Sequence, residues 1–165
     1  MKGPENSKIW IKIFPFSFEL ELDSYGRVTY LRFDLYLTYD KPQFSGEPET
    51  INQANSFVKE FLSYLKGTKN YFEIPHSFKR TSPLSQKVLL TLREIPRGEV
   101  RTYGEFAKRV GLVSSPRAVG QILAHNPLPL IYPCHRIISK NHLGGYSAKV
   151  LNKWLLLYWE KILKT

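Results

Sequence analysis

Strand-like and helix-like segments are separated along this chain, and their order limits the folds open to it. Residues 9–14 and 16–22 are rich in β-branched and aromatic side chains, and the second run alternates apolar with polar positions. Asp23-Ser24-Tyr25-Gly26 predicts a turn, and residues 27–36 predict a strand that completes a hairpin. After residue 82 the signals are those of helices. A small sheet followed by a mainly helical part is therefore expected.

One helix is predicted in the remainder of the first half. A loop over 41–49, which carries proline and glycine, precedes a helix that Thr50 can cap and Gly67 can end. The apolar stripe of this helix is predicted at Ile51, Ala54, Val58, Phe61, Leu62 and Leu65. Residues 70–74 predict a last short strand. Nothing in this half indicates chemistry, so residues 1–78 are interpreted as an α/β scaffold domain.

Residues 79–165 predict a succession of helices. Ser82-Pro83 is an N-cap followed by proline at the first helical position, and this helix should run to Ile95. Its predicted inward face is Val88, Leu89, Leu92 and Ile95. A last helix is predicted over 149–163, with apolar positions at Leu151, Leu155, Leu156 and Tyr158.

Two short helices lie between these. Thr102-Tyr103-Gly104-Glu105 is a capping box that opens one of them, and Gly111 closes it. Ser115-Pro116 opens the next, over 117–125. A pair joined by a tight glycine-containing turn is the helix-turn-helix arrangement, whose second helix lies against DNA. The predicted fold is therefore an α/β N-terminal domain, a small sheet plus a helix, followed by a mostly α, winged-helix-like C-terminal domain with a helix-turn-helix.

The positive charge of the chain is concentrated in its second half. Residues 1–78 carry 9 Lys and Arg against 10 Asp and Glu, a net charge of −1. Residues 79–165 carry 15 against 4, a net charge of +11. A strongly basic half suggests a polyanionic partner, although a basic, well-solvated surface would have the same composition.

Several classes of protein are not expected. No run approaches the roughly 18 consecutive apolar residues of a membrane span, and Met1 to Asn6 do not begin a secretory signal. The one cysteine cannot form an internal disulfide, which fits a reducing compartment. The four histidines are scattered, so no zinc site is predicted. We expect no metal, no cofactor and no membrane partner, and a cytoplasmic location, or a nuclear one in a eukaryote.

The segment from Asn126 to Arg136, NPLPLIYPCHR, is the most informative for chemistry. Its first two prolines fix the backbone and remove amide donors, which predicts a stiff, buried run over 130–132. Cys134 follows a third proline and precedes His135 and Arg136. A free thiol is only a few per cent thiolate at neutral pH, and a nearby cation or histidine would raise that fraction. A lone cysteine is otherwise a small buried hydrophobic residue.

These residues resemble the active-site segment of the O6-alkylguanine-DNA alkyltransferases, or methylated-DNA–protein-cysteine methyltransferases. The resemblance extends over residues 82–160 in the family's order and spacing. Thr102 to Ala107 is similar to the first helix of the family's helix-turn-helix, and Arg117 to Gly120 to the start of its recognition helix. Leu143 to Ser147 is similar to its substrate-side loop. The first 78 residues match the variable N-terminal domain only in length and strand content.

The resemblance implies roles for the reacting residues. Cys134 would attack the alkyl carbon on guanine O6, His135 would take the thiol proton through a water, and Glu160 would orient that histidine. Tyr103, Asn126, Tyr146 and Ser147 would bind the substrate, Asn126 by bracing the turn that leads to the cysteine. Arg136 is interpreted as structural, with a substrate role as the alternative. The alkylated cysteine would not be restored, so each chain would act once.

The DNA contacts implied by the resemblance lie in the recognition helix. Arg117 would fill the gap left by a flipped-out nucleotide, and Ala118 and Gly120 would allow close approach to the minor groove of double-stranded DNA. That groove carries little sequence information, which suits a protein that searches for damage. A monomer is expected, and activity on O4-alkylthymine is left open. Ala148-Lys149 stands where the family usually has glycine, which leaves the range of alkyl groups open.

Three other classes of protein share some of these features. A cysteine hydrolase would also use Cys and His, but no oxyanion-hole motif is recognisable. A transcription regulator would use a helix-turn-helix without a reactive thiol. A catalytically inactive relative would have another residue in place of Cys134. Alkyl transfer accounts for the thiol and the DNA-binding signals together.

Overall fold

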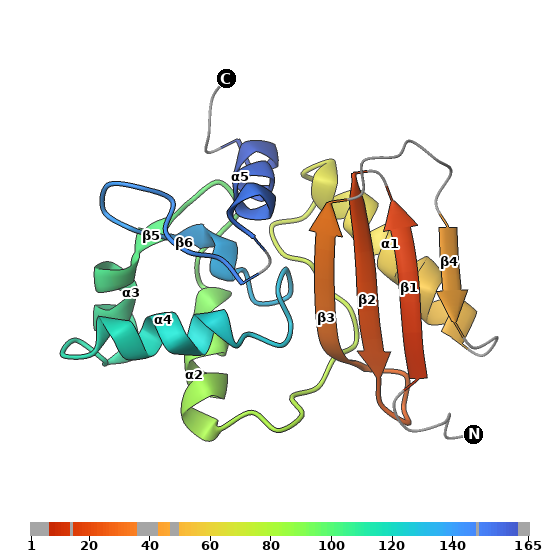
Figure 1. Cartoon of the computed structure of the whole chain (residues 1–165), viewed down its shortest axis with the longest axis horizontal. Helices are drawn as coiled ribbons and strands as arrows, with labels where there is room; N and C mark the ends of the chain where they lie inside the picture. The colour runs from red at the N-terminus through yellow and green to blue at the C-terminus, as the bar shows by residue number, and fades with distance from the viewer. Residues whose placement is uncertain (1–6, 14, 36–42, 47–49, 148, 162–165) are drawn as a thin grey trace. The chain divides into compact units, whose positions relative to one another are not determined.

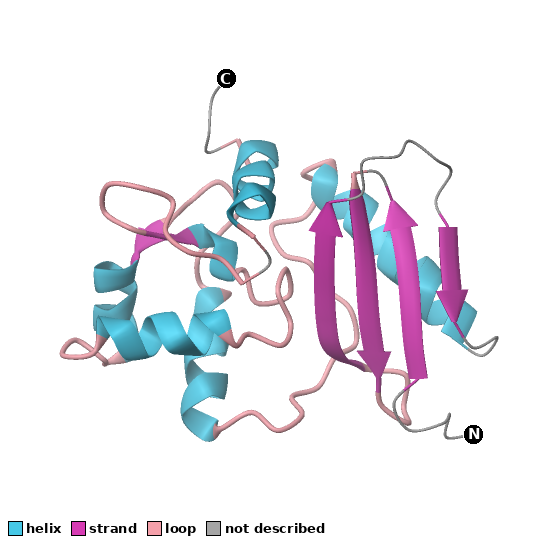
Figure 2. Ribbon diagram, in the orientation of Figure 1, coloured by secondary structure: helices cyan, strands magenta, loops and turns pink. Residues whose placement is uncertain are grey.

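The computed structural model of the chain describes residues 7–13, 15–35, 43–46, 50–147 and 149–161. The chain forms two compact units, Met1–Lys79 and Arg80–Thr165 (Figure 1). The first contains the main sheet and one long helix, and the second is mostly helical (Figure 2).

The sheet of the first unit is antiparallel and has four strands in the order β3-β2-β1-β4. The strands are β1 (Ser7–Ile13), β2 (Phe16–Leu22), β3 (Val28–Leu35) and β4 (Gln43–Gly46). Burial alternates along β2, as the sequence pattern predicted. The predicted turn between β2 and β3 forms, with Gly26 at φ 74° and its N–H donating to the Asp23 carbonyl oxygen at 2.9 Å.

Helix α1 (Ile51–Leu65) lies along one face of this sheet (Figure 1). Its aromatic side chains pack with those of the sheet. The ring centroids of Phe18 and Phe61 are 4.7 Å apart. The predicted apolar stripe of α1 is partly wrong, because Ile51 and Leu62 are exposed. The buried side chains of α1 are Ala54, Phe57, Glu60, Phe61 and Tyr64.

Two other predictions for the first unit are wrong. Residues 43–46, placed in a loop, form β4 because they pair with β1 at the sheet edge. Residues 70–74 form no strand; Phe72 from this segment is buried in the aromatic core instead. The rest of the predicted 41–49 loop, and the ends of the predicted strands at Phe14 and Tyr36, lie outside the described residues.

The helices of the second unit begin at their predicted caps. Helix α2 (Pro83–Leu92) has the Ser82 hydroxyl accepting from the Ser85 N–H at 3.2 Å. Helix α3 (Tyr103–Val110) has the complete Thr102–Glu105 capping box and ends at Gly111, whose φ is 81°. Helix α4 (Pro116–Ala124) follows after a short turn, although the Ser115 side chain makes no capping hydrogen bond.

Short elements and a last helix complete this unit. Strands β5 (Arg101–Thr102) and β6 (Ile137–Ile138) pair in parallel, and the 3₁₀ turn η2 (Cys134–Arg136) precedes β6 directly. Helix α5 (Val150–Trp159) follows the 143–147 loop. None of the helices in the described ranges combines the length and apolar character needed to cross a bilayer.

The ends of α2 and α5 differ from the predictions. Helix α2 ends at Leu92 rather than Ile95, although Ile95 is buried as predicted. The apolar positions named for α5 are only partly buried: Leu156 is buried, whereas Leu151 and Tyr158 are exposed. The side chains that α5 buries are Asn152, Lys153, Leu156 and Leu157. The last predicted residues of this helix, from 162 on, lie outside the described part of the chain.

Candidate active site

Asn126 organises the segment that leads from α4 to the cysteine. Its amide nitrogen donates to the Tyr132 carbonyl oxygen at 2.9 Å and to Cys134 Sγ at 3.1 Å. Its amide oxygen accepts from the Leu128 N–H at 3.0 Å. Residues 130–132 are buried, and Leu130 has a φ of 74°. One buried side chain therefore fixes both the path of this segment and the position of the sulfur.

Cys134 is 4% exposed at the start of η2. Burial raises the pKa of the Cys134 thiol above its ordinary value, because removal from water disfavours the thiolate. Asn126, Lys153 and Tyr146 oppose this rise, but burial dominates. The resting side chain is therefore a neutral thiol, and a nearby group has to take its proton before the sulfur can act as a strong nucleophile.

The sulfur borders a cavity of about 290 Å³. That volume is close to the lower end of the range of small-molecule sites, about 300–1,000 Å³. The lining residues are Tyr103, Gly120, Leu123, Ala124, Cys134, Gly145, Tyr146 and Ser147. Five residues predicted to act at the site thus line one cavity: Tyr103, Gly120, Cys134, Tyr146 and Ser147. Cys134 is buried but borders open space.

The ring of Tyr103 lies between two glycines. A Cβ atom on Gly144 would lie 3.1 Å from Tyr103 Cε2 and 3.0 Å from Ser139 Oγ, and Gly144 has a φ of 75°. On the other side, a Cβ on Gly120 would lie 3.9 Å from Tyr103 Cε1. Burial, and secondarily the charge of a Cys134 thiolate, raise the pKa of the Tyr103 phenol, which keeps it a hydrogen-bond donor.

His135 and Glu160 are both buried and in contact. His135 Nε2 and Glu160 Oε1 are 2.8 Å apart, and both side chains are 0% exposed. Burial lowers the pKa of His135 despite the neighbouring carboxylate. Burial alone would raise the pKa of Glu160, but the hydrogen bonds that His135 and Arg136 donate, together with the charge of Arg136, hold it well below its ordinary value. The site therefore contains a neutral imidazole hydrogen-bonded to an ionised carboxylate.

The other residues predicted for the site lie apart from the cavity lining. Arg117 is exposed at the start of α4, next to the half-buried Ala118. Ala148, one of the two residues that replace the family glycine, lies outside the described residues, and Lys149 adopts a φ of 69°.

Lys153 is a site residue that the sequence did not indicate. Its side chain is fully buried, and its ammonium donates to the Ile137 carbonyl oxygen at 2.6 Å and to the Gly145 carbonyl oxygen at 3.3 Å. Burial lowers the pKa of Lys153 to about 8, and Cys134 partly opposes the shift. Lys153 thus connects β6 to the loop that carries Tyr146.

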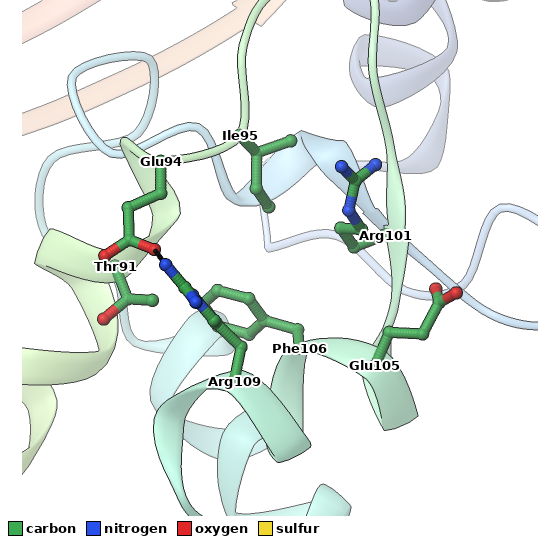
Figure 3. Close-up of a pocket in the computed structure, with 7 residues that line it drawn as sticks. All are labelled: Thr91, Glu94, Ile95, Arg101, Glu105, Phe106 and Arg109. Carbon is green, nitrogen blue, oxygen red and sulfur yellow. Dashed lines mark hydrogen bonds and ion pairs between the residues drawn. The ribbon is translucent and has the colours of Figure 1, made fainter.

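A second cavity, of about 420 Å³, is lined by residues in and near α2, β5 and α3 (Figure 3), and Cys134 is not one of them. Its charged side chains already bind neighbours. Arg109 pairs with Glu94 at 2.6 Å, as Figure 3 shows, and Arg101 pairs with Glu99. Within the described ranges, no three His, Cys, Asp or Glu side chains gather in a way that could hold a metal ion. We assign no chemistry to this cavity.

Comparisons with known proteins identify the family of this chain. Residues 83–162 match the family model of the 6-O-methylguanine DNA methyltransferase DNA-binding domain. The chain is 38% identical over 108 residues to the methylated-DNA–protein-cysteine methyltransferase of Archaeoglobus fulgidus, a match covering 66% of this chain and 71% of that protein. This chain belongs to the methylated-DNA–protein-cysteine methyltransferase family.

Other members of the methyltransferase family match over different lengths. The Methanocaldococcus vulcanius methyltransferase is 48% identical over 83 residues, half of each chain. The crystal structure of Mycobacterium tuberculosis OGT in complex with DNA has a TM-score of 0.70 at 32% identity and covers 88% of this chain and 87% of that one. The predicted family and fold class are both confirmed. Because the structural match covers 88% of this chain, it extends beyond residues 82–160, where the sequence resemblance lies.

Proposed function

We propose that this chain repairs DNA by direct reversal, taking the alkyl group from O6 of a guanine onto Cys134. The observation that carries this proposal is the position of Cys134 beside an open cavity that Tyr103, Tyr146 and Ser147 also line. The relatives are named methylated-DNA–protein-cysteine methyltransferases, and one solved relative is in complex with DNA. In our proposal residues 79–165 bind DNA and accept the alkyl group, and residues 1–78 form the scaffold.

The transfer is an in-line displacement at the alkyl carbon. His135 takes the proton of the Cys134 thiol through a water, and the sulfur forms a bond to carbon while the bond between carbon and O6 breaks. The electron pair of the broken bond stays with the guanine, which gains one proton in place of the alkyl group. Tyr103 donates a hydrogen bond to the base and Ser147 lies beside O6. The thioether has no route back to a thiol, so the chain is consumed.

Access to O6 requires the nucleotide to leave the duplex. Unstacking costs a few kcal/mol, and less for a damaged, poorly paired base. We propose that the recognition helix α4 lies in the minor groove of double-stranded DNA and that the exposed Arg117 fills the vacated position. Ala118 and Gly120 keep this face of the helix small. We expect the protein to act as a monomer. We expect it in the compartment that holds the genome, which is the cytoplasm, or the nucleus in a eukaryote.

Stoichiometry tests the reaction. Incubation with a duplex that contains O6-methylguanine should add one methyl group per chain, because each chain has one cysteine. Mass spectrometry of the intact protein and of its peptides would locate the added mass. Incubation with the unmodified duplex is the control. Transfer of several methyl groups per chain, or a label on another residue, would contradict the proposal.

Substitution of Arg117 tests the DNA-binding part. Arg117→Ala should weaken binding to duplex and slow its repair while reaction with free O6-benzylguanine stays within about twofold, because the free base needs no flipping. Binding should also weaken steeply with salt, since phosphate contacts release counterions. Fluorescence anisotropy and labelling rates would measure both effects. An equal loss with duplex and with free base would remove the proposed role of Arg117.

A further inference from the structure

Arg136 makes more hydrogen bonds to the Glu160 carboxylate than His135 does. Its Nε donates to Glu160 Oε2 at 3.0 Å and its Nη2 to Oε1 at 2.9 Å, an arrangement in which two parallel bonds hold the carboxylate. Its Nη1 donates to the Ile95 carbonyl oxygen at 2.7 Å. The Arg136 and Glu160 side chains are 1% and 0% exposed. A guanidinium this deeply buried is a fixed local charge.

We infer that Arg136 is a positioning residue that keeps His135 neutral and able to accept a proton, by neutralising and orienting the Glu160 carboxylate. This inference rests on the proposed function, in which His135 takes the thiol proton of Cys134. A histidine can do so only if one ring nitrogen still has its lone pair. Because Nε2 is bound to Glu160, that lone pair belongs on Nδ1.

A buried carboxylate beside histidine has two stable arrangements. If no other cation is present, the carboxylate stabilises the imidazolium form of the histidine. Both ring nitrogens then hold a proton, and the histidine can no longer act as a base. With Arg136 bound, the carboxylate is already neutralised, and the guanidinium charge also disfavours an imidazolium. The same contacts keep Glu160 ionised, so it still accepts from His135 Nε2.

The charged groups facing His135 come from two elements. Glu160, after the end of α5, favours the imidazolium, whereas Arg136 in η2 and Lys153 in α5 disfavour it. Cys134 precedes His135 in the same turn and is neutral until its proton leaves. Of the two cations, Arg136 is the one that contacts the carboxylate. It should therefore have the larger effect on the protonation of His135.

The test compares three variants by NMR titration of the histidine rings and by single-turnover methyl transfer. Arg136→Met removes the charge, and the pKa of His135 should rise, with repair at pH 6 slowing about tenfold or more, a part of the roughly 10²–10⁴-fold contribution of a general base. Arg136→Lys retains the charge and should leave the pKa of His135 close to that of the wild type. Arg97→Met is the matched control, since Arg97 binds the Trp159 carbonyl oxygen next to Glu160 and should not shift the titration.

If Arg136→Met does not fold, Glu160→Gln and the double variant Arg136→Met/Glu160→Gln replace it. The pKa of His135 should be higher in the double variant, because only that variant lacks the direct charge effect of the guanidinium. The part of the effect that acts through the carboxylate is measured by the rise of that pKa from Glu160→Gln to the wild type, which should be smaller than an unneutralised carboxylate would cause because Arg136 is in place. An unchanged His135 titration in the charge-removing variants, or an equal rate loss at every pH, would overturn the inference and leave Arg136 as a packing residue. The titration needs no alkyl transfer, so failure of the proposed function would show separately as a wild type that transfers nothing.

Discussion

Cys134→Ser is expected to abolish alkyl transfer while leaving binding to alkylated DNA within about twofold of the wild type. Serine is nearly the same size, and its hydroxyl can accept the hydrogen bond that Asn126 donates to the sulfur at 3.1 Å. The fold should therefore persist. The hydroxyl is a far weaker nucleophile than a thiol, and His135 alone should not activate it.

Two measurements on one sample would separate these effects. Fluorescence anisotropy with a duplex containing O6-methylguanine should show nearly unchanged binding, and mass spectrometry of the same mixture should show no added methyl group. Wild-type protein with unmodified duplex is the control for unspecific labelling. A methyl group on the Cys134→Ser chain would place the acceptor at another residue. Loss of binding would instead mean that the sulfur contributes to recognition of the base.

The pocket residues were predicted through the family resemblance, and local sequence signals account for the positions of two of them. Capping residues place Tyr103 at the start of α3, and the prolines around Cys134 fix a stiff approach, so short stretches of sequence determine both positions. The buried charges could not be predicted in this way. Arg136 meets Glu160 across 24 positions, and Lys153 meets Ile137 across 16. No periodic pattern records a contact between such distant residues.

Helix α5 shows why apolar periodicity failed there. Leu151 and Tyr158 belong to the apolar positions of the pattern, yet both are exposed, and the structure buries Lys153 because its ammonium donates to two carbonyl oxygens. A buried charge needs such partners, and they come from β6 and the 143–147 loop. Helix α1 of the first unit also buries aromatic side chains in place of aliphatic ones. Phe57 contacts Phe18 of the sheet and Tyr64 contacts Phe72, whereas Ile51 and Leu62 are exposed.

Glu160→Gln is expected to lower the free energy of unfolding by about 3–5 kcal/mol, the usual cost of removing one partner of a buried ion pair. The loss arises because Arg136, 1% exposed, would remain charged opposite a neutral amide. Glu94→Gln is the matched control. This substitution breaks the ion pair between Glu94 and Arg109, whose side chains are 51% and 68% exposed respectively. It should lower the free energy of unfolding by at most about 1 kcal/mol. Urea unfolding of the three proteins at pH 7 would measure both values.

The difference in free energy of unfolding between the wild type and Glu160→Gln should depend on pH in a definite direction. The pKa of Glu160 is lower in the folded chain than its ordinary value of 4.5, so the folded state favours the carboxylate. Its contribution is therefore fully present above about pH 4.5 and decreases as the pH falls toward the lower pKa of the folded state. The gap between wild type and Glu160→Gln should stay constant from pH 7 to about 5 and narrow in stronger acid. If Glu160→Gln cost no more than Glu94→Gln, the carboxylate could not be a buried partner of Arg136, and the basis for a neutral His135 would be lost with it.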